Sequence, residues 1–144
     1  MIGLNHALTG AAIGIAVREP LLVVPLAFAS HFALDVIPHF GGHQIYTWGN
    51  KHFTRIIIAD GIACLSIISL IITLNPSLAL PVLLGVFFAM LPDALLVHYY
   101  TKKPLNNWFH NFHLNLQWYE KPQGIVVEAL YLLLISPAIL YLLT

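Results

Sequence analysis

The stretch that decides the fold is Ser30-His31-Phe32-Ala33-Leu34-Asp35-Val36-Ile37-Pro38-His39, at the end of a long apolar segment. On a helix, residues four apart lie on one face, so His31 and Asp35 can direct a ring nitrogen and a carboxylate oxygen to one point. Pro38 should stop the helix because it has no N–H and restricts the residue before it. His39 follows at once and can fold back toward the same point. Imidazole and carboxylate together are ligands of zinc and other first-row divalent metals.

The composition around this stretch is that of a membrane protein. Of the 144 residues, 59% are hydrophobic and 8% are charged, whereas soluble domains carry about 25% charged residues. The mean hydropathy is +0.83. We therefore expect one membrane-embedded domain over 1–144, with the lipid bilayer as its partner. The formal net charge is zero, so no overall positive field indicates a nucleic-acid partner.

The apolar segments predict an all-α integral membrane protein, a compact bundle of about five helices. The first segment is short, because a spanning helix needs about 20 residues. Between the fourth and fifth segments, 105–118 predicts an amphipathic helix with His110, His113 and Gln117 on one face. The five segments are 5–17, 21–37, 53–74, 78–100 and 125–143.

The basic residues predict how the bundle is oriented in an inner or cell membrane. If the five segments alternate direction, one side of the membrane collects most of the lysines and arginines, and the other side has only Arg18. The positive-inside rule places the basic side in the cytoplasm, so we expect a cytoplasmic N-terminus and an outer C-terminus. The residues on the basic side are Lys51, Arg55, Lys102, Lys103 and Lys121.

On this topology the ionisable residues gather in the cytoplasmic half. Such groups inside apolar helices are costly and by default mark a functional site. Because few lysines or arginines are available to neutralise the carboxylates, metal ions are the better partners. We expect a polar metal-site cluster near the cytoplasmic face, drawn from His6, His31, Asp35, His39, Asp60, Asp93, His110, His113 and Glu128.

Three short motifs resemble those of the membrane-bound metal-dependent hydrolases of bacterial and archaeal inner membranes. That family is in turn distantly similar to the zinc-dependent phospholipase C and single-strand nuclease superfamily. The resemblance implies that His6, His31, Asp35 and Asp93 are metal ligands, with His39 as a further one. In the family, Leu-Pro-Asp tends to precede the His-x-x-x-Asp helix, whereas here it follows. The motifs are His6-Ala7-Leu8-Thr9-Gly10, Ser30-His31-x-x-Leu34-Asp35 followed by Pro38-His39, and Leu91-Pro92-Asp93.

The function expected from these residues is metal-dependent hydrolysis at the cytoplasmic face. One or two divalent ions, zinc in the first instance and manganese as an alternative, would lower the pKa of a bound water toward 7. Asp60, His110, His113 and Glu128 are the candidates for a general base or for additional ligands. A site at headgroup depth favours an amphiphilic substrate, and the family analogy favours a lipid phosphoester.

Three other functions stay open on the sequence. A transporter or proton relay also uses intramembrane Asp, Glu and His residues. A haem or quinone protein would use pairs of histidines. In a non-catalytic membrane scaffold, the cluster would be purely structural: His31 and Asp35 would form a buried hydrogen-bonded pair, Asp93 would serve the turn at Pro92, and Asp60 would pair with Arg55 or across helices.

Overall fold

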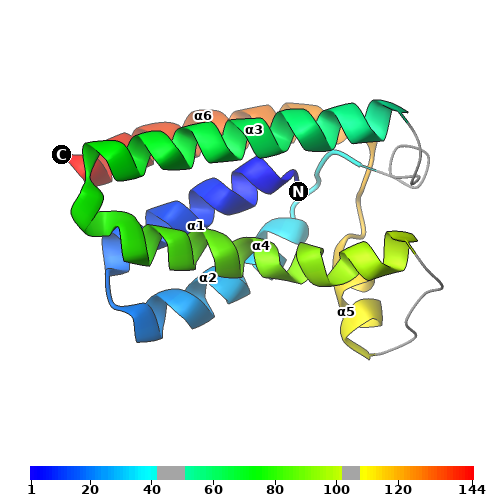
Figure 1. Cartoon of the computed structure of the whole chain (residues 1–144). Coiled ribbons are helices and arrows are strands. Elements are labelled where there is room, and N and C mark those ends of the chain that lie inside the picture. The colour runs from blue at the N-terminus through cyan, green and yellow to red at the C-terminus, as the bar shows by residue number, and fades with distance from the viewer. Residues whose placement is uncertain (42–50, 102–107) are drawn as a thin grey trace.

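The computed structural model describes residues 1–41, 51–101 and 108–144 and is built of helices (Figure 1). The all-α prediction is confirmed: among the described residues there is no strand, only an isolated bridge between His39 and Glu120. Five helices match the five apolar segments, and a sixth, α5, falls in the predicted amphipathic stretch. They are α1 (Gly3–Val17), α2 (Pro20–Asp35), α3 (Lys51–Leu74), α4 (Ala79–Thr101), α5 (Trp108–Leu116) and α6 (Ile125–Leu143), with short 3₁₀ turns η1 (Pro76–Leu78) and η2 (Pro122–Gly124).

Three helical segments are long and apolar enough to cross a membrane: Lys51–Leu74, Pro76–Leu95 and Pro122–Leu143. Their outer faces carry exposed large apolar side chains such as Leu65 and Leu133, both 71% exposed. Water would disfavour such surfaces, whereas lipid tails cover them. Helices α1 and α2 are apolar but shorter, as expected for the first segment.

Helix α1 is the centre of the bundle and packs against α2, α3, α4 and α6 (Figure 1). Its contact with α4 is a backbone contact between glycines. A Cβ on Gly10 would lie 2.2 Å from the carbonyl oxygen of Gly85, and one on Gly14 would lie 2.3 Å from that of Pro81. Small residues allow such close approach in membrane helices. The short first helix is therefore enclosed by its longer neighbours.

The end of α2 differs slightly from the prediction. The helix ends at Asp35, two residues before the predicted 37, although the Val36 and Ile37 amides still donate to Phe32 and Leu34. After Pro38 the chain passes the start of α6, where His39 N–H donates to Tyr119 and the His39 carbonyl accepts from Lys121, both at 3.2 Å. At this crossing Gly124 has no room for a side chain, since a Cβ would lie 2.0 Å from the His39 carbonyl carbon.

The polar ends of the helices meet at one end of the bundle. Figure 1 shows the end of α2, the later part of α4, all of α5 and the starts of α1, α3 and α6 toward the same side. Helix α4 continues as a helix through Pro92, where the sequence predicts a kink. This arrangement brings residues far apart in sequence into one region.

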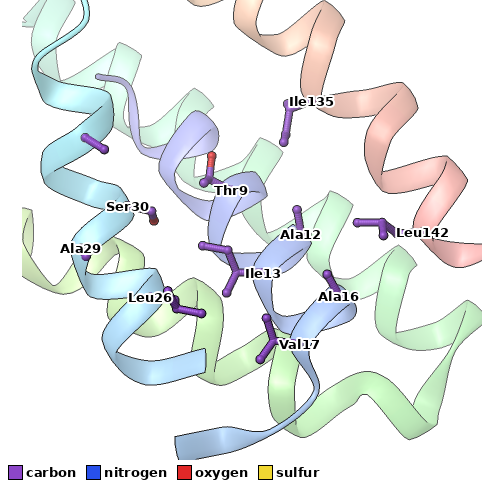
Figure 2. Close-up of a pocket in the computed structure, with 11 residues that line it drawn as sticks. Thr9, Ala12, Ile13, Ala16, Val17, Leu26, Ala29, Ser30, Ile135 and Leu142 are labelled. Carbon is purple, nitrogen blue, oxygen red and sulfur yellow. The ribbon is translucent and has the colours of Figure 1, made fainter. Parts of the chain in front are cut away.

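The face of α2 opposite His31 and Asp35 lines an apolar groove of about 590 Å³ between α1, α2 and α6 (Figure 2). Its α2 residues are Leu26, Ala29, Ser30 and Ala33, which recur at helical spacing on one side of the helix. His31 and Asp35 point to the other side. The groove is therefore separate from the polar cluster.

Candidate metal centre

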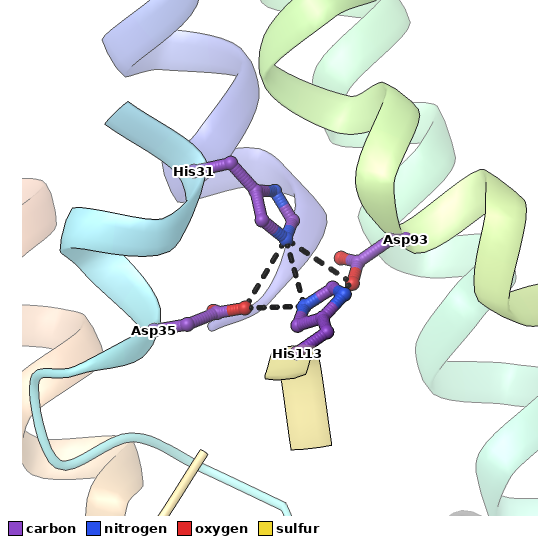
Figure 3. A group of neighbouring side chains, drawn as sticks. All are labelled: His31, Asp35, Asp93 and His113. Carbon is purple, nitrogen blue, oxygen red and sulfur yellow. Dashed lines mark hydrogen bonds and ion pairs between the residues drawn. The ribbon is translucent and has the colours of Figure 1, made fainter. Parts of the chain in front are cut away.

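Four side chains from three helices converge on one point and could hold a metal ion. His31 and Asp35 come from α2, Asp93 from α4 and His113 from α5, and one donor atom from each lies within 4.8 Å of all the others (Figure 3). We call these residues the metal-site group. His113, expected only as an additional residue, is thus a full member, and it reaches the site from a part of the chain about 80 positions after His31.

The four donor atoms lie close enough together to share one metal ion. His31 Nε2 lies 3.1 Å from both Asp35 Oδ2 and His113 Nε2, His113 Nε2 lies 2.8 Å from Asp35 Oδ2, and every pair in the group lies within 4.8 Å. Asp93 Oδ1 lies 3.5 and 3.7 Å from the same two imidazole nitrogens. Bonds to zinc of about 2.0–2.1 Å in tetrahedral geometry place neighbouring ligand atoms about 3.3–3.4 Å apart. Most of the separations in the group are near this value, so the group could hold a metal ion.

The orientation of His31 is set by a backbone carbonyl. Its Nδ1 lies 2.7 Å from the carbonyl oxygen of Ala89 in α4. A carbonyl only accepts hydrogen bonds, so Nδ1 carries a proton, and in the neutral ring Nε2 presents its lone pair to the group. Backbone carbonyls hold metal-binding histidines in this way.

Asp35 is the most heavily contacted member of the group. Its Oδ1 accepts from the α-amino group of Met1 at 2.7 Å, and His6 Nε2 lies 3.2 Å from the same oxygen. Its Oδ2 faces both imidazoles and accepts from Gln117 Nε2 at 3.2 Å. Gln117 thereby joins the site. It follows His113 by four residues, and that shared face is the sequence signal for it.

The group opens to its surroundings at Asp93. The side chains of His31, Asp35 and His113 are fully buried, whereas that of Asp93 is 41% exposed. Water or a substrate group therefore has access to the Asp93 carboxylate.

His6 and His39 lie near the group without completing it. The His6 ring stacks on His31 with centroids 4.1 Å apart, and neither of its nitrogens has a hydrogen-bond partner within the described ranges. The contact of His6 with Asp35 is close but does not have hydrogen-bond geometry. His39 Nδ1 donates to the Ile37 carbonyl at 2.8 Å, and its buried Nε2 is unpartnered there as well. Burial, and then the nearby α-amino group, lower the pKa of His39.

Asp60 and Glu128 are held by hydrogen bonds that organise the start of α1. Asp60 Oδ1 accepts from the Leu4 amide at 3.0 Å. Glu128 accepts from the Ile2 amide at 3.0 Å, the Phe40 amide at 3.3 Å and the side-chain amide of Asn5. We call Glu128, Asp60, Asn5 and these backbone donors the Glu128 network. Neither carboxylate belongs to the metal-site group, and the side chain of His110 lies outside what the structure describes.

Comparison of the chain with protein-family models, curated proteins and solved structures gives no match. The resemblance to metal-dependent hydrolases therefore rests on the three sequence motifs alone.

Proposed function

We propose that the protein is a membrane-embedded metal-dependent hydrolase that cleaves a phosphoester of a lipid or another amphiphile. The observation that carries the proposal is the convergence of two imidazole nitrogens and two carboxylates on one point, with spacing that suits a metal ion.

A metal ion satisfies this arrangement better than protons do. The lone pair of His31 Nε2 lies 3.1 Å from His113 Nε2 and 3.5 Å from Asp93 Oδ1. A proton can form a hydrogen bond between only two of these atoms at a time. The lone pairs of the other donor atoms would still point toward one another. An ion at the centre receives a lone pair from every donor and offsets the charge of both carboxylates. Two nitrogens and two oxygens favour zinc first and manganese second.

Some residues of the site would hold the ion, and another would face the substrate. A bound divalent ion would supply an acidified water. The three buried members of the group would hold the ion, with the Ala89 carbonyl and Gln117 orienting two of them. Asp93, which is partly exposed, would face the incoming water and ester. His6 stacks beside the group, and neither of its ring nitrogens has a hydrogen-bond partner among the described residues.

The place of the site supports an amphiphilic substrate. The group lies toward the end of the bundle where the candidate spans α3 and α6 begin (Figure 1). That depth is where the headgroup of a lipid meets its chains. We place this end on the cytoplasmic side because most lysines and arginines fall there.

Metal content tests the proposal first. We would measure zinc and manganese by inductively coupled plasma mass spectrometry on protein purified in mild detergent. The wild type and the control Ser30→Ala, which changes the groove face of α2, should hold metal. The double variant His31→Ala/Asp35→Ala should hold none. Full metal content in a folded double variant contradicts the metal site.

Hydrolysis is tested on the metal-loaded wild type. Vesicles containing phosphatidic acid or phosphatidylglycerol should release phosphate or headgroup, and a chelator should stop the release. A loaded protein that cleaves neither these nor other lipid phosphoesters would retain the metal site and lose the hydrolase assignment. A metal-free wild type would favour a proton relay along His31, His113 and Asp35, whose direct contacts suit proton transfer.

A further inference from the structure

Helix α5 has two unlike sides. One side faces the site with Phe109, His113 and Gln117, which recur every four residues. The flank beside it carries Trp108 and Phe112, which are 76% and 43% exposed. Their ring centroids lie 6.1 Å apart, so they form one aromatic patch. Behind this patch, positions 111 and 115 are exposed asparagines.

The described contacts of α5 are mainly with the end of α2. Phe32 of α2 touches the rings of Phe109, Phe112 and His113, with centroid distances of 6.1, 5.4 and 5.5 Å. Just beyond the helix, Trp118 Nε1 donates to the Val36 carbonyl at 2.9 Å. Figure 1 shows α5 running across the direction of the long helices rather than along them. A nine-residue helix is marginal alone, so its position depends on what it packs against.

The surface next to α5 continues the lipid-facing surface of the bundle. Val36 and Ile37 are 46% and 37% exposed at the end of α2, and Ile125 and Val126 are 50% and 60% exposed at the start of the α6 span. Trp118 is 65% exposed between them. Tryptophan and tyrosine concentrate where hydrocarbon meets water. An aromatic patch on one flank and asparagines on the next match that boundary, with the apolar flank in the lipid.

We propose that Trp108 and Phe112 seat α5 in the membrane–water interface, and that this seating completes the metal-site group by holding His113 in place. The coupling rests on the proposed metal site, whereas the seating does not. The bilayer then helps to form the metal site. When α5 is not seated in the interface, His113 is no longer held beside the other three donors. The apparent affinity for metal falls in proportion to the fraction of molecules with α5 seated.

Zinc affinity in lipid nanodiscs tests the coupling. The variant Trp108→Ser should bind zinc about fivefold more weakly than the wild type if seating falls to about one fifth of molecules. The matched control is Tyr141→Ser, which removes an 80% exposed aromatic near the far end of α6. It should leave zinc affinity unchanged. Equal affinity of Trp108→Ser and wild type in nanodiscs overturns the coupling.

Fluorescence quenching tests the seating without metal. Lipids brominated near the headgroup end of the chain should quench the wild type more than Trp108→Phe, and the difference reports the depth of Trp108. The absence of a difference overturns the seating, whatever the metal result. A quenched Trp108 in a wild type that binds no zinc overturns the coupling and the proposed function together. Zinc binding without quenching overturns the seating of α5, and with it the coupling, and leaves the proposed metal site in place.

Discussion

Two polar clusters lie at the same end of the bundle, and they differ in the groups that contact their carboxylates. In the Glu128 network, the described donors to the carboxylates are all amides: Leu4 for Asp60, and Ile2, Phe40 and Asn5 for Glu128. In the metal-site group, carboxylate oxygens face imidazole nitrogens at 2.8–3.7 Å, and one of those nitrogens has its proton directed elsewhere. In the first cluster the carboxylates are satisfied by amide donors, although the buried Asn5 Oδ1 has no partner within the described residues. In the second, the Met1 α-amino group bonds Asp35 Oδ1, and the remaining donor atoms could share a metal ion.

The difference separates structural acids from functional ones within a single membrane protein. A buried carboxylate that accepts several N–H bonds is stabilised as an anion and ties elements together. A buried carboxylate placed among lone pairs is costly unless a cation joins them. On this ground Asp35 and Asp93 are candidates for chemistry, and Asp60 and Glu128 are candidates for holding α1 in place.

The largest effect should follow from Asp35→Asn, which keeps the shape of the side chain and removes its charge. We expect metal affinity to fall by more than about 100-fold, because loss of an outer partner alone costs about 10- to 100-fold. The measurement is competition with a chromogenic chelator. The same variant should fold in the absence of metal. If Asp35→Asn still bound metal tightly, Asp35 would not be a metal ligand, and the proposed difference between the two clusters would be wrong.

For Glu128→Ala we expect the reverse, namely lower stability with metal binding retained. Three donors, from Ile2, Phe40 and Asn5, would lose a common acceptor. Since one unsatisfied buried donor costs about 1–3 kcal/mol, we expect stability to fall by about 3 kcal/mol. The folded fraction should still bind one metal ion. Thermal unfolding in mild detergent measures the first effect and metal analysis the second, and loss of metal without loss of stability would contradict this assignment.

Metal removal should destabilise the wild type and leave Asp35→Asn unchanged. At a free zinc concentration of 100 times the dissociation constant, binding adds about 2.7 kcal/mol to the stability of the folded state. A chelator should therefore lower the unfolding midpoint only where the group is intact. An equal shift in Glu128→Ala and wild type would show that the two clusters act independently. A shift of similar size in Asp35→Asn would place the metal elsewhere.

The smallest effect is expected for Gln117→Ala. Gln117 donates to Asp35 Oδ2 and holds it toward the imidazoles, but it is not a member of the group. We expect about tenfold weaker metal binding and little change in unfolding. Gln123→Ala, an exposed glutamine in η2, serves as the control. No change in affinity would make Gln117 a packing residue only.

Much of the helical framework was predictable because it follows from local rules. Apolar runs interrupted at Arg18-Glu19-Pro20 and Asn75-Pro76 predicted the helices to within a few residues, and the predicted range 125–143 matches α6. The spacing of His31 and Asp35 placed both on one face of α2. The end of α2 was predicted two residues late, because Pro38 sets a limit on the helix rather than its last residue.

The partners of the polar residues were harder to predict. His6 and His39 were expected as ligands, and the structure places both beside the metal-site group rather than in it. Asp60 was expected to act chemically, to pair with Arg55 or to form a hydrogen bond across helices, and its bond from the Leu4 amide of α1 agrees with the last of these. These outcomes depend on which backbone groups lie nearby after packing, and a pattern of residue types does not contain that information.

The sequence by itself determined an apolar helical chain with its histidines and acids gathered toward one end, because hydrophobic periodicity and helix-breaking residues act over a few positions. Only the tertiary structure determined which carboxylates lie beside imidazole nitrogens and which accept hydrogen bonds from amide groups. That choice depends on the glycine contact of α1 with α4, on α5 reaching back to α2, and on the Ala89 carbonyl orienting His31. Each of these joins residues far apart in the chain, and a difference of a few ångströms separates a metal ligand from a structural hydrogen bond.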